Sequence, residues 1–241
     1  MGTVKTQEEI KLIKKAAEIS DSCLPLIEKS LRENITEEEL RRRINRKIRS
    51  QHATLSFQTL VASGKRSSMI HAKPHATDEI ISGIGYIDFG ACYKGYRSDL
   101  TVPFIKGKVS ERERRVVEIT LKAYDVAINS IKVGMPCRKL FEKVDNFLRK
   151  NGFRMSHSLG HGVGKKIHEL PYIGKPSKKH LTKKIKKRWE RLKKINFQEG
   201  MVFTIEPAVY VKGKYGCRLE NDVLIKRKRL KILTHAKLIE I

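Results

Sequence analysis

The chain carries the same order of helical and extended segments twice, and this repeat limits the folds that it can adopt. Apolar residues recur at helical spacing over residues 6–32 and again from about Thr36, and strand-like segments follow them. Helical spacing returns over residues 110–132 and 137–150, and strand-like segments follow again. We therefore expect an α+β fold of two similar halves, each with two helices and a set of strands, and a site where the two sets of strands meet.

Three hydroxyl side chains are expected to begin the helices. Thr6 and Thr36 are each followed three residues later by a glutamate, Glu9 and Glu39, which is the pattern of a capping box. Ser110 stands at the start of the third helical segment. Helix starts are therefore predicted at these three positions.

Length and cysteine usage favour a domain that folds without disulfide bonds. The 241 residues contain no linker long enough to divide the chain, so we expect one domain over residues 1–241. The first residues contain no apolar stretch typical of a signal peptide, and no segment approaches the ~20 apolar residues of a membrane span. The four cysteines are far apart in sequence and form no CxxC pair: Cys23, Cys92, Cys137 and Cys217. These features predict a cytoplasmic protein with free thiols and without a transmembrane segment.

The segment HSLGHGVGKKIHELP, residues 157–171, is unusually rich in histidine and glycine. His161 lies between Gly160 and Gly162, and a glycine allows the backbone to approach another group closely. His168 follows seven residues later. One histidine on a polar loop is usually structural, but this spacing suggests a metal site for which the rest of the chain must supply carboxylates.

Four acidic residues interrupt apolar or β-rich segments elsewhere in the chain. Asp88 and Asp99 are eleven residues apart, and Glu206 and Glu220 are fourteen apart, each pair on strands expected to be neighbours. Any one of them alone is most simply a solvent-facing strand residue, since unpaired burial of a carboxylate costs several kcal/mol. Together with His161 they suit two divalent ions such as Mn, Co, Fe or Zn. Bridging carboxylates hold such ions about 3.5–4 Å apart.

At this point the sequence resembles a known family, the metallopeptidases of the pita-bread fold. These include methionine aminopeptidases, Xaa-Pro aminopeptidases and prolidases. The resemblance covers about residues 6–226, and its motifs arrive in the family's order: IDFGACYKGYRSDLT, HSLGHGVGKKIHELP, GMVFTIEPAVYV and CRLENDVLI. It implies two pseudo-symmetric halves, each of two helices followed by strands, around a curved antiparallel sheet. It also allows a homodimer.

The resemblance implies a role for each candidate ligand. Asp88 would chelate one metal ion and His161 would bind the other. Asp99 and Glu220 would bridge both ions. Glu206 would be a ligand that also helps to move the proton of the attacking water.

Residues that contact the peptide substrate are implied by the same resemblance. His168 would contact the substrate and steady the tetrahedral intermediate, and Arg218 would also bind substrate. One more catalytic histidine is expected upstream of Asp88. His71 lies seventeen residues before Asp88, which matches the family pattern without gaps, whereas His75 follows a proline as the family histidine does. We expect His71 to fill this role, with His75 as the alternative.

The motifs favour the Xaa-Pro branch over the methionine branch. HSLGHGVG followed by IHELP, DFGACYKGYRSDLT and SFQTLVASG all resemble the Xaa-Pro enzymes. Thr101–Pro103 and Ser82-Gly83 depart from that pattern, and the first predicted helix matches the start of the catalytic domain, so only that domain is expected. Removal of initiator methionine is therefore kept as an alternative. A non-catalytic protein that binds RNA or the ribosome on the same fold is the alternative from another class.

Positive charge is concentrated between His168 and Glu206. The chain has 52 Lys and Arg against 26 Asp and Glu, a net charge of +26. Residues 175–194, KPSKKHLTKKIKKRWERLKK, resemble an insertion of roughly fifteen residues relative to the family, and apolar residues at helical spacing within them predict a basic helix. A basic helix attracts polyanions, so ribosomal RNA is a candidate partner, while a solvated surface helix and compositional drift are the plain alternatives.

Overall fold

A computed structural model describes residues 3–175, 190, 192 and 194–241. The first half of the chain begins with three helices and continues into short strands, a 3-10 helix and two long strands. These elements are α1 (Gln7–Asp21), α2 (Leu24–Leu31), α3 (Glu37–Arg49), β1 (Thr54–Leu55), β2 (Leu60–Ser63), η1 (Gly64–Ser68), β3 (Gly83–Phe89), β4 (Ala91–Tyr93), β5 (Tyr96–Arg97) and β6 (Leu100–Lys106).

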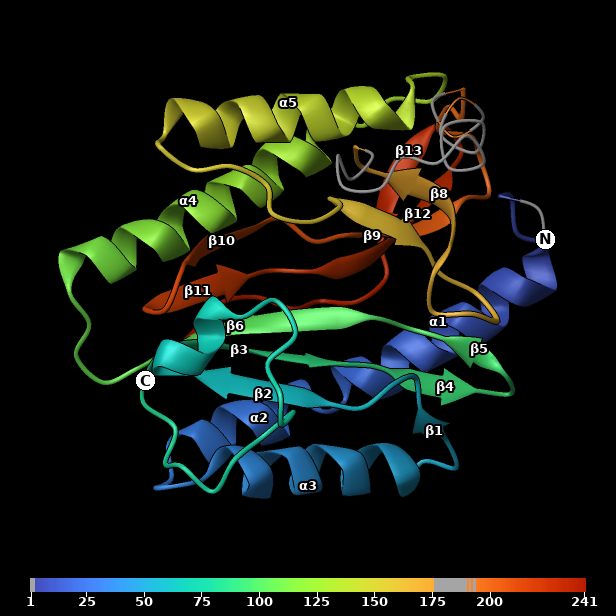
Figure 1. Ribbon diagram of the computed structural model, residues 1–241. Coiled ribbons are helices and arrows are strands. Elements are labelled where there is room, and N and C mark those ends of the chain that lie inside the picture. Colours follow the sequence, from blue (N-terminus) through green and yellow to red (C-terminus); the bar gives the residue numbers. More distant parts are fainter. Residues whose placement is uncertain (1–2, 176–189, 191, 193) are drawn as a thin grey trace.

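The second half repeats the order of helices and then strands. Its elements are α4 (Glu111–Ile128), α5 (Cys137–Lys150), β7 (Gly160–Gly162), β8 (Glu169–Ile173), β9 (Val202–Ile205), β10 (Ala208–Val211), β11 (Tyr215–Arg218), β12 (Asn221–Lys226), β13 (Arg229–Ile232) and β14 (Ile239–Glu240). In Figure 1, α4 and α5 lie on one side of the strands, and α2 and α3 lie on the other. The predicted α+β order of two similar halves is confirmed.

Each half has its own main sheet. The first half forms a four-stranded sheet in the order β14-β6-β3-β2, and the second forms a five-stranded sheet in the order β13-β12-β9-β7-β8. The expected pairings are present: β3 pairs with β6, and β9 pairs with β12, both antiparallel. The last strand, β14, returns to pair with β6 in parallel. Two smaller sheets, β1-β4-β5 and β10-β11, extend the strand layer.

One of the backbone contacts between the two halves lies beside the site. Thr101 in β6 and Glu220 between β11 and β12 form an isolated antiparallel bridge. The Thr101 amide donates to the Glu220 carbonyl at 3.3 Å, and the Glu220 amide donates to the Thr101 carbonyl at 3.1 Å. This bridge brings the segment that carries Asp99 beside the segment that carries Glu220, because each acid is at most two residues from the bridge.

The helix starts are as predicted, but one helix is divided. Thr6, Thr36 and Ser110 each form a capping box with the glutamate three residues on. The single helix predicted over residues 6–32 is wrong, because α1 ends at Asp21 and α2 begins at Leu24. Pro25 explains the break, since a proline has no N–H to donate to the carbonyl four residues earlier.

The helix predicted over residues 110–132 also ends early, at Ile128. The Ser130 hydroxyl donates to the Val126 carbonyl, which a continuing helix would offer to the Ser130 amide. The prediction of a helix over 137–150 is confirmed.

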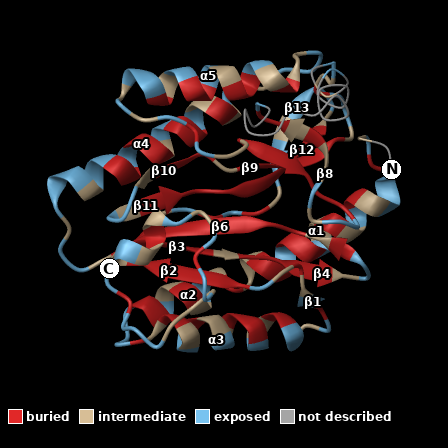
Figure 2. Cartoon of the chain, in the orientation of Figure 1, coloured by how far each residue is buried: buried red, intermediate tan, exposed pale blue. Residues whose placement is uncertain are grey.

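Burial follows the layered arrangement. Figure 2 shows that the strands are largely buried and that the helices expose their outer faces. The largest fully buried side chains include Tyr86 and Phe89 in β3, Phe104 in β6 and Phe203 in β9. In the described ranges, no helix has the length and apolar character needed to cross a lipid bilayer. A cytoplasmic location stays a prediction.

Candidate metal centre

A cavity of about 260 Å³ lies where the strands of the two halves meet. Both halves contribute to its walls, which are acidic at their centre and carry histidines around the acids. The lining residues are Phe57, Ile70, His71, Asp88, Asp99, His157, Ser158, His161, Ile167, His168, Glu206, Arg218 and Glu220. All eight residues that the sequence nominates for the site therefore face one cavity, although they are spread over 150 residues of chain.

The two aspartates reach the cavity from neighbouring strands. Asp88 lies near the end of β3, directly opposite Thr101 of β6. Asp99 precedes β6, and its backbone amide donates to the side chain of Asp222 at 2.9 Å. Asp222 is fully buried, so this bond fixes the backbone next to Asp99 against β12.

The glycines beside His161 allow β7 to lie close to its neighbours. A Cβ atom added at Gly160 would be 1.9 Å from the Thr204 carbonyl oxygen, and one added at Gly162 would be 2.1 Å from the Leu170 carbonyl oxygen. Any side chain at either position would therefore force β7 away from the adjacent backbone. This close approach is what the sequence analysis expected of the two glycines, and it places His161 in the buried wall of the cavity.

Donor atoms suited to a metal ion converge on this cavity. Ligand atoms of Asp99, His161 and Glu220 all lie within 4.8 Å of one another. His161 Nε2 is 3.6 Å from Asp99 Oδ2 and 3.7 Å from Glu206 Oε1. Asp88 Oδ1 is buried and has no hydrogen-bond partner among the described residues. Oxygen and imidazole donors in this arrangement fit divalent cations, and an orphaned carboxylate oxygen is the observation that such a cation would explain.

The protonation of these groups reflects their crowding. Burial, reinforced by the neighbouring carboxylates, raises the pKa of Asp99 and of Glu206 well above the ordinary values. Burial and the charge of Asp88 raise the pKa of Glu220 to about 7. Burial lowers the pKa of His161 to about 3, so its imidazole is neutral and able to bind a metal. A cation at the centre would relieve the repulsion between the acids and favour their charged forms.

Arg218 is a buried cation that links several residues around the cavity by hydrogen bonds. Its guanidinium donates to Asp88 Oδ2, to Thr101 Oγ1 at 3.1 Å and to Tyr210 Oη at 2.6 Å. It also lies over the Tyr86 ring, 4.2 Å from the ring centre. Because its donors are engaged with protein groups and only 2% of the residue is exposed, its evident role is to hold Asp88. Direct substrate contact by Arg218 stays a prediction.

The loop that carries His71 is fastened to the same network. Arg218 donates to the Ile70 carbonyl at 3.2 Å, and the Tyr86 hydroxyl donates to the Met69 carbonyl. His71 lines the cavity, and burial is the largest cause of its lowered pKa. His75 is absent from the lining, and its carbonyl accepts a hydrogen bond from Val61 at 2.8 Å. The choice of His71 over His75 therefore agrees with its position, while its role stays a prediction.

Two further histidines, His168 and His157, lie beside the proposed ligands. The rings of His161 and His168 meet edge to face with centres 4.3 Å apart. His157 was given no role in the sequence analysis, yet its Nδ1 lies 3.5 Å from Glu206 Oε2 and its Nε2 lies 3.3 Å from Tyr210 Oη. Tyr210 was also missed. Both residues lie four positions from a proposed ligand, His157 before His161 and Tyr210 after Glu206. That spacing was the signal in the sequence that could have identified them.

The predicted basic helix of residues 175–194 lies almost entirely outside the described residues. Within it the structure describes positions 175, 190, 192 and 194, and the Lys175 ammonium lies 3.3 Å from Asp145 of α5. The basic insert therefore stays a prediction.

Comparison with known proteins places this site in a family. The model of metallopeptidase family M24 matches residues 11–227. An uncharacterized peptidase of Methanocaldococcus jannaschii is 37% identical over 244 residues, covering 100% of this chain and 66% of the relative. The Xaa-Pro dipeptidase of Pyrococcus furiosus is 34% identical over 236 residues, covering 96% of this chain and 63% of the relative.

Solved structures agree with these sequence matches. The prolidase of Pyrococcus horikoshii superposes with a TM-score of 0.86 at 31% identity, covering 98% of this chain and 64% of that one. The X-Pro aminopeptidase of Thermotoga maritima superposes with a TM-score of 0.85 at 32% identity, covering 99% and 65%. The chain thus spans a little under two thirds of the length of these relatives, and its fold is the pita-bread fold that the resemblance implied. The chain belongs to metallopeptidase family M24.

Proposed function

We propose that the chain is a metal-dependent aminopeptidase that holds two divalent ions and hydrolyses the first peptide bond of substrates whose second residue is proline. One observation carries this proposal: four carboxylates, two of them buried and two partly buried, line one cavity together with a neutral histidine, and they come from both halves of the fold. Arg218 pairs with Asp88 alone among these acids, so bound cations would offset the desolvation cost of the others.

The family resemblance supplies the ligand roles. Asp99, two residues before the bridge between the halves, and Glu220, which forms that bridge, would be shared by both ions. Asp88, whose Oδ1 lacks a partner, would hold one ion, and His161 with Glu206 would hold the other. When bound, Mn, Co, Fe or Zn would supply an activated water and polarise the carbonyl of the scissile bond.

The chain's own residues would handle the proton and the substrate. Glu206 faces the cavity, and a cation beside it would favour its charged form, so its carboxylate would be placed to accept a proton from the attacking water and pass it to the leaving nitrogen. His157 lies beside Glu206 and would shape that side of the cavity, with its Nδ1 hydrogen-bonded to the Ser158 carbonyl at 2.6 Å. His71 and His168 border the cavity on the loop side, where each could donate to the developing negative charge on the substrate.

Preference for proline is supported by the named relatives and by the motifs. Two of the relatives are named Xaa-Pro dipeptidase. Of the superposed structures, one is a prolidase and another is an X-Pro aminopeptidase. A proline nitrogen carries no N–H, so the site must hold the ring by its shape. Phe57, Ile70 and Ile167 give the cavity an apolar border that suits such a ring.

The proposal is tested by the hydrolysis of Ala-Pro and Met-Ala peptides side by side, with Mn, Co, Fe or Zn added to metal-free protein. We expect metal-dependent release of the first residue from the proline peptide. Preferential release of methionine would instead support the alternative of initiator-methionine removal, and no hydrolysis of either peptide with any metal would refute both.

Binding to RNA or the ribosome is the alternative from another class, and it rests on charge alone. The chain carries a net charge of +26. Among the described residues, Arg42, Arg46 and Arg49 lie on the outer face of α3. The turn after β12 and the first residue of β13 carry three more cations, at 227–229. Electrostatic attraction to phosphate at such surfaces does not require the acidic cavity, so the two functions are separable.

A further inference from the structure

A second cavity lies beside the metal centre and differs from it in charge. Its volume is about 630 Å³, and it is formed by the residues around η1, the segment that follows α5 and the strand β10. The described residues that line it are Ser68, Ile70, Arg149, Gly152, Phe153, Arg154, Ser156, Val209, Tyr210 and Lys212. Three of these side chains are cationic and none is acidic.

The two cavities share a wall. Ile70 lines both of them. Tyr210 lines the second cavity, and its hydroxyl accepts a hydrogen bond from Arg218 at 2.6 Å and lies 3.3 Å from His157 Nε2. Arg218 and His157 both face the first cavity. One layer of side chains therefore separates the acidic site from the cationic one.

Two of the three cations have no acidic partner. Arg149 Nε donates to Asp145 at 3.0 Å, so its charge is largely compensated. Arg154 and Lys212 are exposed at the cavity surface, and neither forms an ion pair within the part of the chain that the structure describes. Their charges are available to an anion that enters the cavity.

The second cavity would attract an anionic group of a bound peptide. Carboxylates are attracted to cations, and a peptide whose first residues occupy the first cavity carries its terminal or side-chain carboxylates further along the chain. The first cavity, at about 260 Å³, is smaller than the ~300–1,000 Å³ typical of sites that enclose a whole ligand. An extended chain advances about 3.3–3.6 Å per residue, so residues after the second extend out of the first cavity, and the second cavity is its neighbour across Ile70 and Tyr210.

We propose that the second cavity binds a carboxylate of a substrate longer than a dipeptide, through Arg154 and Lys212. The proposal rests on the proposed peptidase function and specifies its substrate class: oligopeptides with an acidic group beyond the second residue. That group is either the terminal carboxylate or the side chain of Asp or Glu. Arg154 and Lys212 act on binding and take no part in bond cleavage.

The test compares matched peptides that differ only in one carboxylate. Ala-Pro-Ala-Ala with a free carboxyl terminus is compared with its terminal amide, and Ala-Pro-Ala-Glu amide is compared with Ala-Pro-Ala-Gln amide. We expect kcat/KM to favour the acidic member of a pair by about 3- to 10-fold, the effect of one or two partly exposed charge contacts. Preference in the first pair identifies the terminal carboxylate, and preference in the second identifies the side chain.

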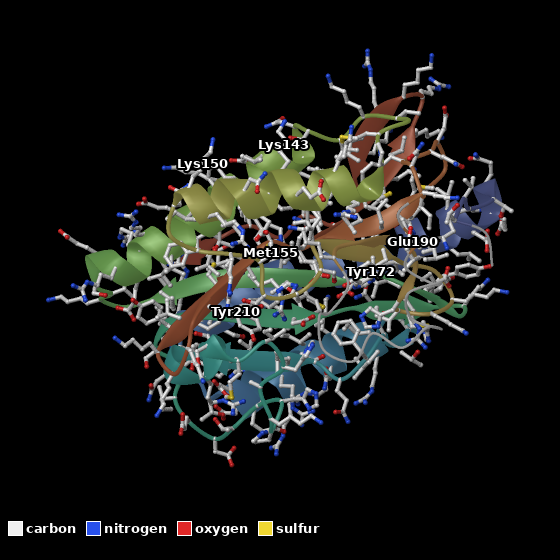
Figure 3. All side chains as sticks on the ribbon, turned by 45° about the horizontal axis from the view of Figure 1, so that its top comes forward. Lys143, Lys150, Met155, Tyr172, Glu190 and Tyr210 are labelled. Atoms are coloured by element: carbon white, nitrogen blue, oxygen red, sulfur yellow. The ribbon has the colours of Figure 1, made fainter. Side chains whose placement is uncertain are left out.

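A double variant and a control assign the effect to the cavity. In the double variant Arg154→Gln/Lys212→Gln, the ratio of kcat/KM for the acidic peptide to kcat/KM for the neutral peptide should fall close to one. Lys143→Gln with Lys150→Gln removes the same charge from the exposed surface of α5, on the opposite side of that helix from Tyr210 (Figure 3), and should keep the wild-type ratio. A wild-type ratio near one in both pairs, or an unchanged ratio in the double variant, would overturn the proposal.

Failure of the peptidase function is distinguished by a binding measurement. The same peptides with the first peptide bond reduced to a methylene-amine cannot be hydrolysed, and their affinities are measured by calorimetry. If no peptide is cleaved but the acidic peptides still bind more tightly to wild type than to the double variant, the cavity is confirmed and the peptidase function is refuted. If the double variant loses only RNA binding, the cavity binds phosphate and the proposal is wrong.

Discussion

Removal of one buried hydroxyl should weaken the junction between the two halves. Thr101 is fully buried, and its hydroxyl donates to Glu220 Oε2 at 2.7 Å while it accepts from Arg218 Nε at 3.1 Å. The substitution Thr101→Val keeps the shape of the side chain and removes both bonds. It leaves a buried carboxylate and a buried guanidinium each without one partner.

The size of the effect follows from the charges of those partners. A hydrogen bond to a charged group contributes ~1.5–3 kcal/mol, which gives a range of about 3–6 kcal/mol for the two. Arg218 keeps Tyr210, Ile70 and Asp88 as partners, so we take the lower end, about 3 kcal/mol. For a chain of 150–250 residues, 1 kcal/mol shifts the melting temperature by about 2–4 °C, so a fall of about 6–12 °C is expected.

The matched control is Thr120→Val. Thr120 is also fully buried, but its hydroxyl donates to the neutral Val116 carbonyl at 2.9 Å, one turn earlier in α4. Loss of such a bond costs ~1 kcal/mol, or about 2–4 °C. The assay is calorimetric melting of metal-free protein at about pH 8, where the Glu220 carboxylate is mostly ionised because its pKa is about 7. Equal destabilisation by the two variants would refute the reasoning that charged partners make Thr101 the costlier site.

Three further outcomes are expected. His71→Ala should lower turnover by about 10²-fold, whereas His75→Ala should have a much smaller effect, and steady-state kinetics of both would expose a reversed assignment. Glu220 has a folded pKa of about 7 against an ordinary 4.5, so its contribution to the stability of metal-free protein is full below about 4.5 and is lost as the pH rises through about 7. Denaturant titrations should therefore show a steeper loss between about pH 5 and 8 in wild type than in Glu220→Gln, and equal slopes would contradict this. Deletion of residues 175–194 should spare hydrolysis of a short peptide and reduce the salt dependence of RNA binding, and an unchanged salt slope would make that segment a solvated surface only.

Local sequence was sufficient to predict the elements and their repeated order. Capping boxes at Thr6, Thr36 and Ser110 depend on contacts three residues apart, so they can be read directly from the sequence. The break between α1 and α2 was missed because Pro25 was weighed less than the apolar spacing around it. The proline rule gives the correct boundary once it is applied.

The composition of the cavity was predicted better than its internal contacts. Acidic residues within apolar strands can be recognised in the sequence, because the carboxylate of such a residue must face water, a hydrogen-bonding partner or a cation. The pairing of Arg218 with Asp88 across 130 residues, and the bridge from Thr101 to Glu220, depend on how the two sheets meet. No local sequence pattern predicts how the two sheets pack against each other, so these long-range contacts could be seen only in the structure. His157 is different, because it lies four residues before His161 in the same histidine-rich segment and could have been found by that spacing.

Titration of metal-free protein with Mn tests the central claim most directly. Calorimetry or equilibrium dialysis counts the ions bound, and release of alanine from an Ala-Pro peptide is measured at each step. The account predicts two ions per chain at saturation, activity that appears with them, and reduced metal binding with loss of activity in Asp99→Asn and Glu220→Gln, since both residues would bridge the ions. Full hydrolysis by chelator-treated protein, or metal binding and activity unchanged in both variants, would contradict it.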